Sequence, residues 1–110
     1  MADTKDVVLI PFPGAVQTKP RPAVVVSTDL YHRTRPDITF ALLTGVVAGA
    51  LDPTDYVLVD WAAAGLHRPT AFRAFFATRP ATEIISQIGT LTDRDWAEVQ
   101  ARLRLALAVA

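Results

Sequence analysis

"VVLIPFPGAVQTKPRPAVVVS", residues 7–27, decides the fold, because two apolar runs flank a loop that contains proline and glycine. Residues 7–12 form a short apolar run and residues 23–27 are β-branched, so both segments predict buried strands. Pro11 has no amide proton to donate to a neighbouring strand, which predicts an edge position or a bulge. The chain therefore begins as a sheet of short strands.

Further short segments extend this sheet. Four of them predict strands, because each is apolar and bounded by turn residues: 38–44, 55–59, 70–77 and 84–89. The polar segment 28–37 predicts a turn. Residues 60–69 predict one helical turn, with Asp60 as its N-cap and Gly65 as its stop.

The last segment, residues 90–110, changes to helical spacing. Thr92 followed by Asp95 predicts a helix start that resembles a capping box. An apolar stripe then faces the sheet and consists of Trp96, Val99, Leu103 and Leu107. The expected fold is mainly β, a small and strongly bent sheet or barrel with a C-terminal helix that closes one side.

Length and composition limit the class of protein. The 110 residues suffice for a single domain over 1–110 and are too few for two. No apolar run approaches the ~20 residues of a membrane helix, and the start resembles no export signal. We therefore expect a soluble, cytoplasmic protein with no membrane partner. Because cysteine is absent and His32 and His67 are isolated, no disulfide, metal or cofactor is expected.

The charge pattern leaves two interpretations open. A formal net charge of zero argues against nucleic-acid binding through a bulk positive field. The basic residues nevertheless gather in or beside predicted turns. This pattern is compatible with a local basic groove and equally with loops that are simply solvated.

Arg21 is the first candidate for chemistry because it lies between Pro20 and Pro22. Proline fixes its own φ and restricts the residue before it, so Arg21 has little backbone freedom. A guanidinium held in this way can bind a phosphate through two hydrogen bonds. The alternative is a surface arginine at a proline-rich turn.

Four segments together resemble the MazF/PemK/Kid toxins of bacterial toxin–antitoxin pairs: "DVVLIPFPG…KPRPAVVVS", "DITFALLT", "DYVLVDW…AGLHRPTAFR" and "IGTLTDRDWAEV". The resemblance implies an SH3-like barrel of the MazF/PemK/CcdB type that forms a homodimer. It also implies metal-independent, sequence-specific cleavage of single-stranded RNA and DNA binding together with the antitoxin. A disordered segment of the cognate antitoxin would lie across the dimer groove and silence the toxin.

The resemblance also implies roles for individual residues. Thr44, which ends the third predicted strand beside Gly45, would place its hydroxyl near the scissile phosphate, so Arg21 and Thr44 are the predicted catalytic pair. Arg73 lies on the less apolar face of its strand and would face the groove. In Kid-like members an aspartate follows two residues later, whereas this chain has Phe75, for which a core role or stacking on a base is open.

The remaining predicted RNA contacts lie on loops and strand ends, and with Arg73 they are Gln17, Lys19, Ser27, His32, Arg35 and His67. The proton carrier stays undecided at this stage. Arginine is a poor base near neutral pH, and either histidine has a suitable ordinary pKa.

Three functions compete. The first is an RNA-cleaving toxin, which the Arg21 and Thr44 pair favours. The second is a barrel without cleavage activity that inhibits a protein partner, as the related gyrase-poisoning toxins do; the neutral charge and Phe75 favour it. The third is a non-toxic module that binds RNA or a peptide.

Overall fold

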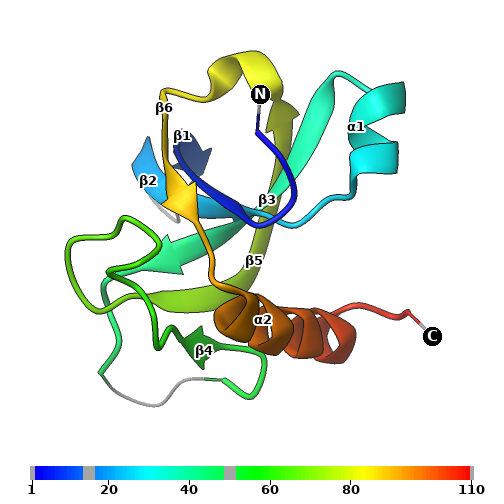
Figure 1. The fold of residues 1–110 in the computed structure, drawn as a ribbon. Helices are drawn as coiled ribbons and strands as arrows, with labels where there is room; N and C mark the ends of the chain where they lie inside the picture. The colour runs from blue at the N-terminus through cyan, green and yellow to red at the C-terminus, as the bar shows by residue number, and fades with distance from the viewer. Residues whose placement is uncertain (1, 14–16, 49–51, 110) are drawn as a thin grey trace.

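A computed structural model describes residues 2–13, 17–48 and 52–109. Six antiparallel strands form one curled sheet in the order β4-β5-β3-β2-β1-β6, and α2 packs beneath it (Figure 1). The strands are β1 (Asp6–Pro13), β2 (Thr18–Val25), β3 (Asp37–Thr44), β4 (Tyr56–Val57), β5 (Ala71–Pro80) and β6 (Ser86–Thr90). The helical segments are α1 (Asp29–Thr34), the short 3₁₀ helix η1 (Ala81–Glu83) and α2 (Asp93–Ala106). The mainly β fold with a C-terminal helix is confirmed, as a half-barrel.

The sheet is buried on both faces in its centre. One core lies between the sheet and α2 and includes Val7, Val24 and Phe72. The other lies on the opposite face and includes Ile10, Phe12 and Phe40. Because both faces are covered along most of β1 and along Ala23–Val25 of β2, these segments are continuous apolar runs without polar alternation. The apolar runs in the sequence therefore identified the central strands.

Pro11 lies where the sheet narrows. β6 pairs with β1 from Asp6 to Leu9, so beyond Leu9 that side of β1 has no neighbouring strand among the described residues. Pro11 therefore occupies a local edge, as predicted, and the irregularity in the ladder falls between Val7 and Val8 instead.

Four local predictions were wrong. Residues 18–20, expected in the loop, belong to β2. Residues 29–34 form α1, not a turn, because the Thr28 hydroxyl caps the helix by accepting from the amide of Tyr31. Residues 61–65 form turns but no helix, and the Asp60 side chain accepts from Thr92 and Arg94 instead of capping. β4 has only two residues: the amide of Leu58 still donates to the carbonyl of Thr70, but the amides of Val59 and Asp60 donate to the carboxylate of Asp95.

Helix α2 begins as predicted and ends earlier than its apolar stripe. The Thr92 hydroxyl accepts from the amide of Asp95 at 3.4 Å, and Trp96, Val99 and Leu103 pack on the core. Leu107 is 44% exposed, because it is the extended C-cap residue and no longer follows the helical stripe. Among the described residues, no helix is long and apolar enough to cross a membrane.

Candidate functional site

The strands β2 and β3 separate beyond Ala23. Their pairing covers only Ala23–Val25 against Phe40–Leu42. The amide of Val26 donates to the carbonyl of Thr39 at 3.0 Å, and amides two residues apart on a strand point to the same neighbour. The nitrogens of Pro22 and Pro20 therefore face β3 but carry no proton to donate. We infer that the two prolines end this ladder, while pairing of β2 with β1 continues to Thr18.

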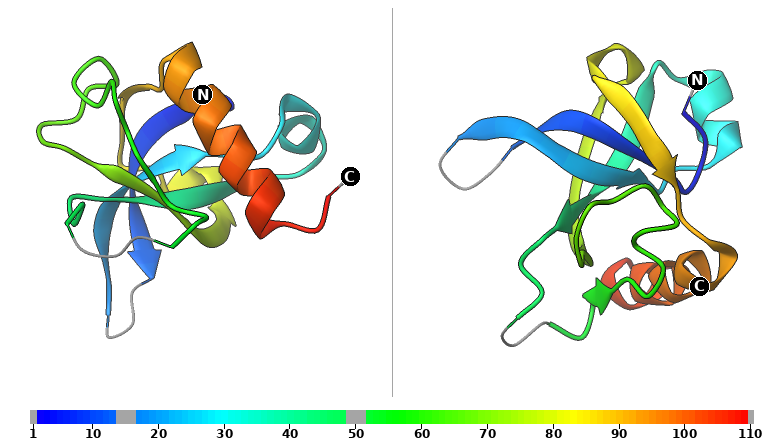
Figure 2. Two further views of the ribbon diagram at one scale, coloured as in Figure 1. Left: turned by 90° about the horizontal axis from the view of Figure 1, so that it is seen from below. Right: turned by 60° about the vertical axis from the view of Figure 1, so that its left-hand side comes forward.

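The gap left by the prolines is a cavity of about 320 Å³, called here the Arg21 cavity. Its lining residues are Lys19, Pro20, Arg21, Pro22, Leu43, Thr44, Gly45, Val46 and Arg68. If the β2–β3 register continued, Arg21 would stand opposite Thr44; instead both line the space between the separated strands. The paired ends of β1 and β2 project past the other strands in Figure 2. The structure thus brings together the two residues predicted as the catalytic pair.

Arg21 and Thr44 both have hydrogen-bonding capacity left for a ligand. The buried Nε of Arg21 has no partner among the described residues. A buried donor without a partner costs about 1–3 kcal/mol, and more when it is charged. The Nε of Arg102 is unpartnered in the same way, so it is the cation-rich lining around Arg21 that marks this arginine as a candidate for binding an anion. The Thr44 Oγ1 accepts from the amide of Val46 at 3.2 Å, so its own proton can be donated elsewhere.

Arg68 is a member of the site that the sequence analysis missed. A Cβ on Gly45 would come within 3.1 Å of Cδ and 3.3 Å of Nε of Arg68, so the Arg68 side chain lies directly against the backbone that follows Thr44. Gly45 directly after Thr44 was the available signal, but nothing local links it to a residue 23 positions away. The described lining now holds three cations, Lys19, Arg21 and Arg68, and no carboxylate. Such a lining suits a phosphate.

Arg73 and Phe75 lie outside this cavity. The Nη1 of Arg73 is 3.8 Å from Oδ2 of the buried Asp55, so this arginine is partly neutralised. Phe75 is 47% exposed and contacts Phe12 edge to face, with ring centroids 5.5 Å apart. The expectation of a plain core role for Phe75 is therefore wrong, and its accessible face is compatible with stacking.

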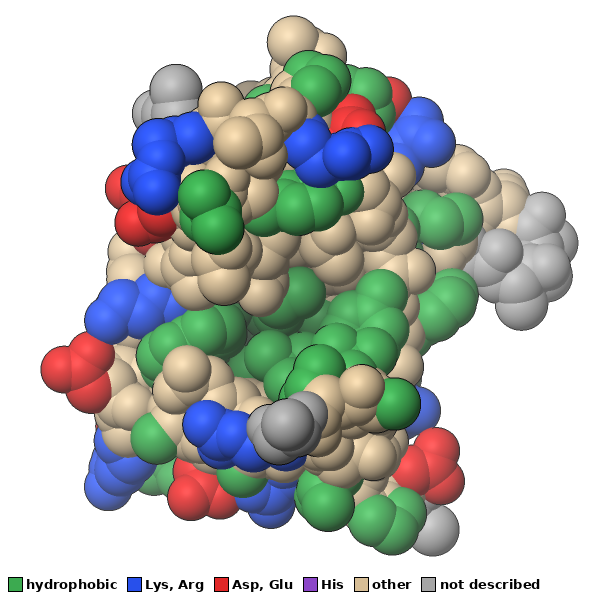
Figure 3. Space-filling model, turned by 90° about the vertical axis from the view of Figure 1, so that its right-hand side faces the viewer, with side chains coloured by type: hydrophobic (Ala, Val, Ile, Leu, Met, Phe, Trp, Pro, Cys, Tyr) green, Lys and Arg blue, Asp and Glu red, His purple; other side chains and the backbone are tan. Residues whose placement is uncertain are grey.

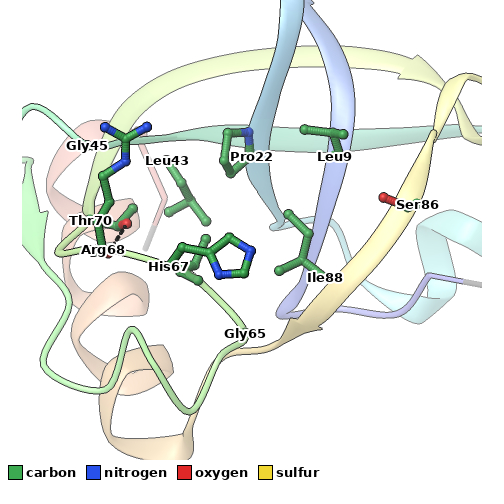
Figure 4. A pocket seen from close by; sticks show the side chains of 11 residues that line it. Leu9, Pro22, Leu43, Gly45, Gly65, His67, Arg68, Thr70, Ser86 and Ile88 are labelled. Carbon is green, nitrogen blue, oxygen red and sulfur yellow. Dashed lines mark hydrogen bonds between the residues drawn. The ribbon is translucent and has the colours of Figure 1, made fainter.

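The two histidines lie in different places. His67 lines a second cavity of about 420 Å³ that adjoins the Arg21 cavity (Figure 4). His32 lies beyond the opposite end of β2, where its Nε2 is 2.6 Å from Oγ of Ser27. Arg35 lies there too, with its guanidinium 5.6 Å from the centre of the Tyr31 ring. Of the other predicted RNA contacts, Lys19 borders the Arg21 cavity and Gln17 is exposed just before β2.

A second polar group, called here the Asp95 cluster, ties α2 to the segment after β4. The fully buried Asp95 carboxylate accepts from the hydroxyl of Tyr56 at 2.7 Å and from the amides of Val59 and Asp60 at 3.0 and 2.8 Å. Burial, followed by the hydrogen bond to Asp95, raises the pKa of Tyr56 far above its ordinary value. Hydrogen bonds from Arg94 and Thr92 lower the pKa of Asp60. These shifts accompany structural contacts away from the Arg21 cavity.

Metal ligands do not gather in the described structure. Among residues 2–13, 17–48 and 52–109, no group of three or more His, Cys, Asp or Glu side chains is placed to hold a metal ion. The chemistry that the Arg21 cavity itself can offer is charge stabilisation and hydrogen-bond donation to an anion.

Comparison with known proteins identifies the family. No curated protein sequence matches the chain. Several solved structures have the same fold. One is an endoribonuclease in complex with its cognate antitoxin from Mycobacterial species; its sequence is 17% identical, and its TM-score is 0.77. The match covers 100% of this chain and 98% of that chain. The Mycobacterium tuberculosis toxin MazF-mt6 has 19% identity, a TM-score of 0.76 and coverage of 96% and 98%. MazE-MazF (Form-III) from Deinococcus radiodurans has 17% identity, a TM-score of 0.76 and coverage of 99% and 98%.

At these identities the solved structures support the fold, and the family rests on the sequence match. Residues 3–107 match the family described as PemK-like, MazF-like toxin of type II toxin-antitoxin system, which confirms the resemblance. The chain therefore belongs to the PemK-like, MazF-like toxin family of type II toxin–antitoxin systems.

Proposed function

We propose that the chain is an endoribonuclease toxin that cleaves single-stranded RNA without a metal ion, with the Arg21 cavity as its active site. The observation that carries this proposal is the meeting of Arg21 and Thr44 in one cation-lined gap. The unpartnered Nε of Arg21 supports it, because a bound phosphate oxygen would satisfy this donor.

The proposed reaction uses the RNA's own 2′-hydroxyl. Its oxygen forms a bond to phosphorus while the bond from phosphorus to the 5′-oxygen breaks, which leaves a 2′,3′-cyclic phosphate and a 5′-hydroxyl. Arg21 neutralises the charge that builds up on the phosphoryl oxygens, and Thr44 donates a hydrogen bond to one of them. The lining holds neither a histidine nor a carboxylate among the described residues, so water takes the 2′ proton and returns one to the 5′-oxygen.

Cleavage of a long single-stranded RNA in EDTA tests this function. The wild type should produce discrete cuts with 2′,3′-cyclic phosphate ends, and Arg21→Ala and Thr44→Ala should abolish them with the fold intact. Arg104→Ala is the matched control, because Arg104 is exposed near the end of α2 and forms no ion pair with the described residues. Uncut RNA with a folded wild type would contradict the proposal.

A second function has its own supporting observation. The Arg21 cavity has neither a histidine nor a carboxylate among its described lining residues, and Phe75 replaces the aspartate of Kid-like members. A barrel that inhibits a protein partner without cutting RNA would have this lining. The two functions separate in the same experiment, because Arg21→Ala would then leave toxicity unchanged.

We further propose that the chain forms a homodimer through apolar surface near the C-terminal end of α2. Figure 3 shows hydrophobic side chains lining a hollow on the side toward which the C-terminus points in Figure 1. Leu105, Leu107 and Val109 are exposed at this end of the chain. Leu105→Glu with Leu107→Glu should produce a monomer in sedimentation equilibrium, whereas Ile85→Glu, at another exposed apolar position, should leave a dimer. A wild-type monomer would contradict the proposal.

The proposed antitoxin is acidic and contains apolar residues, so that it can cover both the cations of the Arg21 cavity and the apolar side chains of Leu43 and Val46 beside them. Co-expression with the product of a neighbouring gene should suppress RNA cleavage. A neighbouring product that binds but leaves cleavage unchanged would contradict this assignment.

A further inference from the structure

We propose that the cavity beside His67, called here the His67 cavity, binds one unstacked base of the RNA whose phosphate lies at Arg21 and Thr44; this inference rests on the proposed function. The cavity has a volume of about 420 Å³, which is within the range of small-ligand sites. Its residues were not predicted to form a site, apart from His67 as an RNA contact.

The floor of the His67 cavity is one row of residues that crosses four strands. Ser86 of β6 pairs with Leu9 of β1, and Leu9 pairs with Pro22 of β2. Leu43 of β3 follows the last β2–β3 pair and lies across the gap from Pro22. All four line the cavity, and three of them are apolar. A largely apolar floor of this kind suits the face of a base.

The segment that carries His67 is fixed to β6 by two close backbone contacts. Gly65 has φ of +89°, and a Cβ there would lie 2.4 Å from the carbonyl oxygen of Ile88. A Cβ on Gly89 would lie 2.2 Å from the carbonyl oxygen of Ala64. Because only glycine permits these approaches, the wall beside His67 is held against β6 before any ligand binds. Binding therefore requires little ordering of the wall.

The His67 cavity opens onto the Arg21 cavity through the gap between β2 and β3. The two cavities share Pro22, Leu43, Gly45 and Arg68 in their linings. A phosphate in the gap would thus have its own nucleoside beside the apolar floor. In Figure 4 the His67 ring stands among Pro22, Leu43 and Ile88, whereas the Arg68 guanidinium points away toward Gly45.

Polar groups at the rim could contact the edges of a base. Ser86 and His67 are exposed at the cavity's margin. The Thr70 hydroxyl donates to the carbonyl of Arg68 at 2.8 Å and keeps its lone pairs for accepting. An apolar floor with a few polar groups at its edge favours a base over an aliphatic side chain of a protein partner.

The test uses the four ribonucleoside 3′-monophosphates and inorganic phosphate as separate probes, followed by NMR on the His67 ring and on the amides of Gly65 and Leu66, which line the His67 cavity but not the Arg21 cavity. His32→Gln assigns the His67 ring signals. At least one nucleotide should shift these signals, and inorganic phosphate should not. Ser86→Phe, which fills the cavity from its exposed rim, should weaken nucleotide binding about fivefold or more, the low end of the contribution of one stacked base. It should leave the affinity for phosphate unchanged.

A second variant, His67→Ala, gives the same comparison through the amide signals if Ser86→Phe does not fold. Three results would overturn the inference: no nucleotide shifts the signals, inorganic phosphate shifts them equally, or neither variant weakens nucleotide binding. In each case a protein side chain would be the better candidate occupant of the His67 cavity. Failure of the proposed function is a separate outcome, because nucleotide binding at His67 without any RNA cleavage would refute the activity and support the base site.

Discussion

The Arg21 cavity and the Asp95 cluster both hold charged groups away from bulk water, and they differ in how their hydrogen bonds are satisfied. The Asp95 carboxylate accepts from three donors at 2.7 to 3.0 Å. In the Arg21 cavity, a buried guanidinium nitrogen has no partner among the described residues. The satisfied group holds two elements together, and the unsatisfied one has capacity left for a ligand. Mutations should therefore separate stability from activity.

The largest effect on stability is expected from Asp95→Ala. The change leaves the Tyr56 hydroxyl and two amides without their acceptor, and each buried unsatisfied donor costs about 1–3 kcal/mol, so the free energy of unfolding should fall by about 3 kcal/mol or more. Urea denaturation measures this loss. Asp93→Ala is the matched control on the same helix, because that carboxylate is exposed and pairs only with Lys5. Equal losses in both variants would contradict the structural role of the cluster.

At Arg21 we expect the opposite pattern, a large loss of activity with little loss of stability. Arg21→Ala should lower RNA cleavage by about 100-fold or more, the usual cost of removing one preorganised donor to transition-state charge. The free energy of unfolding should change little, because the lost Nε made no hydrogen bond to the described residues. Cleavage rate and urea midpoint should be measured on the same preparation. Arg35→Ala, at the other end of β2, should change neither; a drop in cleavage there would extend the site to that end.

Pro22→Val tests the origin of the gap. Valine restores an amide proton directed at β3, so the β2–β3 ladder can lengthen and the Arg21 cavity can narrow. Cleavage should fall about tenfold, because small displacements of a positioned group are costly. Hydrogen exchange should show a protected amide at position 22. Pro80→Val, at the exposed end of β5, is the control. An unprotected amide with unchanged cleavage would show that the prolines do not create the site.

Most of the sheet and α2 could be predicted because apolar runs and helical spacing are local signals. Thr92 and Asp95 marked the start of α2 correctly. Helix α1 was missed because most of its residues are polar and give no apolar stripe. Its N-cap, Thr28, is a residue type that is equally common in turns. The two-residue length of β4 could not be predicted, because it follows from amides that bond to Asp95, 35 or more residues later.

The site was predictable in part for the same reason. The prolines that flank Arg21 are a local signal, and the family resemblance added Thr44. The position of Arg68 and the lining of the His67 cavity depend on how the loop before β5 packs against β1, β2 and β3. Because these residues are far apart in the chain, no local sequence pattern predicts that packing. Conversely, Ser27 and His32 are close to Arg21 in sequence, yet the length of β2 carries them to its other end.

The smallest expected effect concerns the pH dependence of the Asp95 cluster. Burial and the hydrogen bond to Asp95 raise the pKa of Tyr56 far above its ordinary value of 10.0. Because the folded state holds this proton more tightly than the unfolded chain, the associated stability is complete below pH 10 and is lost progressively as the pH rises above it.

Tyr56→Phe removes one hydrogen bond, so it should cost about 1 kcal/mol at pH 7. Its stability should then fall less than that of the wild type between pH 9 and pH 11, roughly one pH unit on either side of the ordinary tyrosine value. Urea denaturation at both pH values measures the difference, with Tyr31→Phe as the control, since the Tyr31 hydroxyl makes no hydrogen bond to the described residues. Parallel losses in the wild type and Tyr56→Phe would mean that alkaline unfolding begins elsewhere than at the Asp95 cluster.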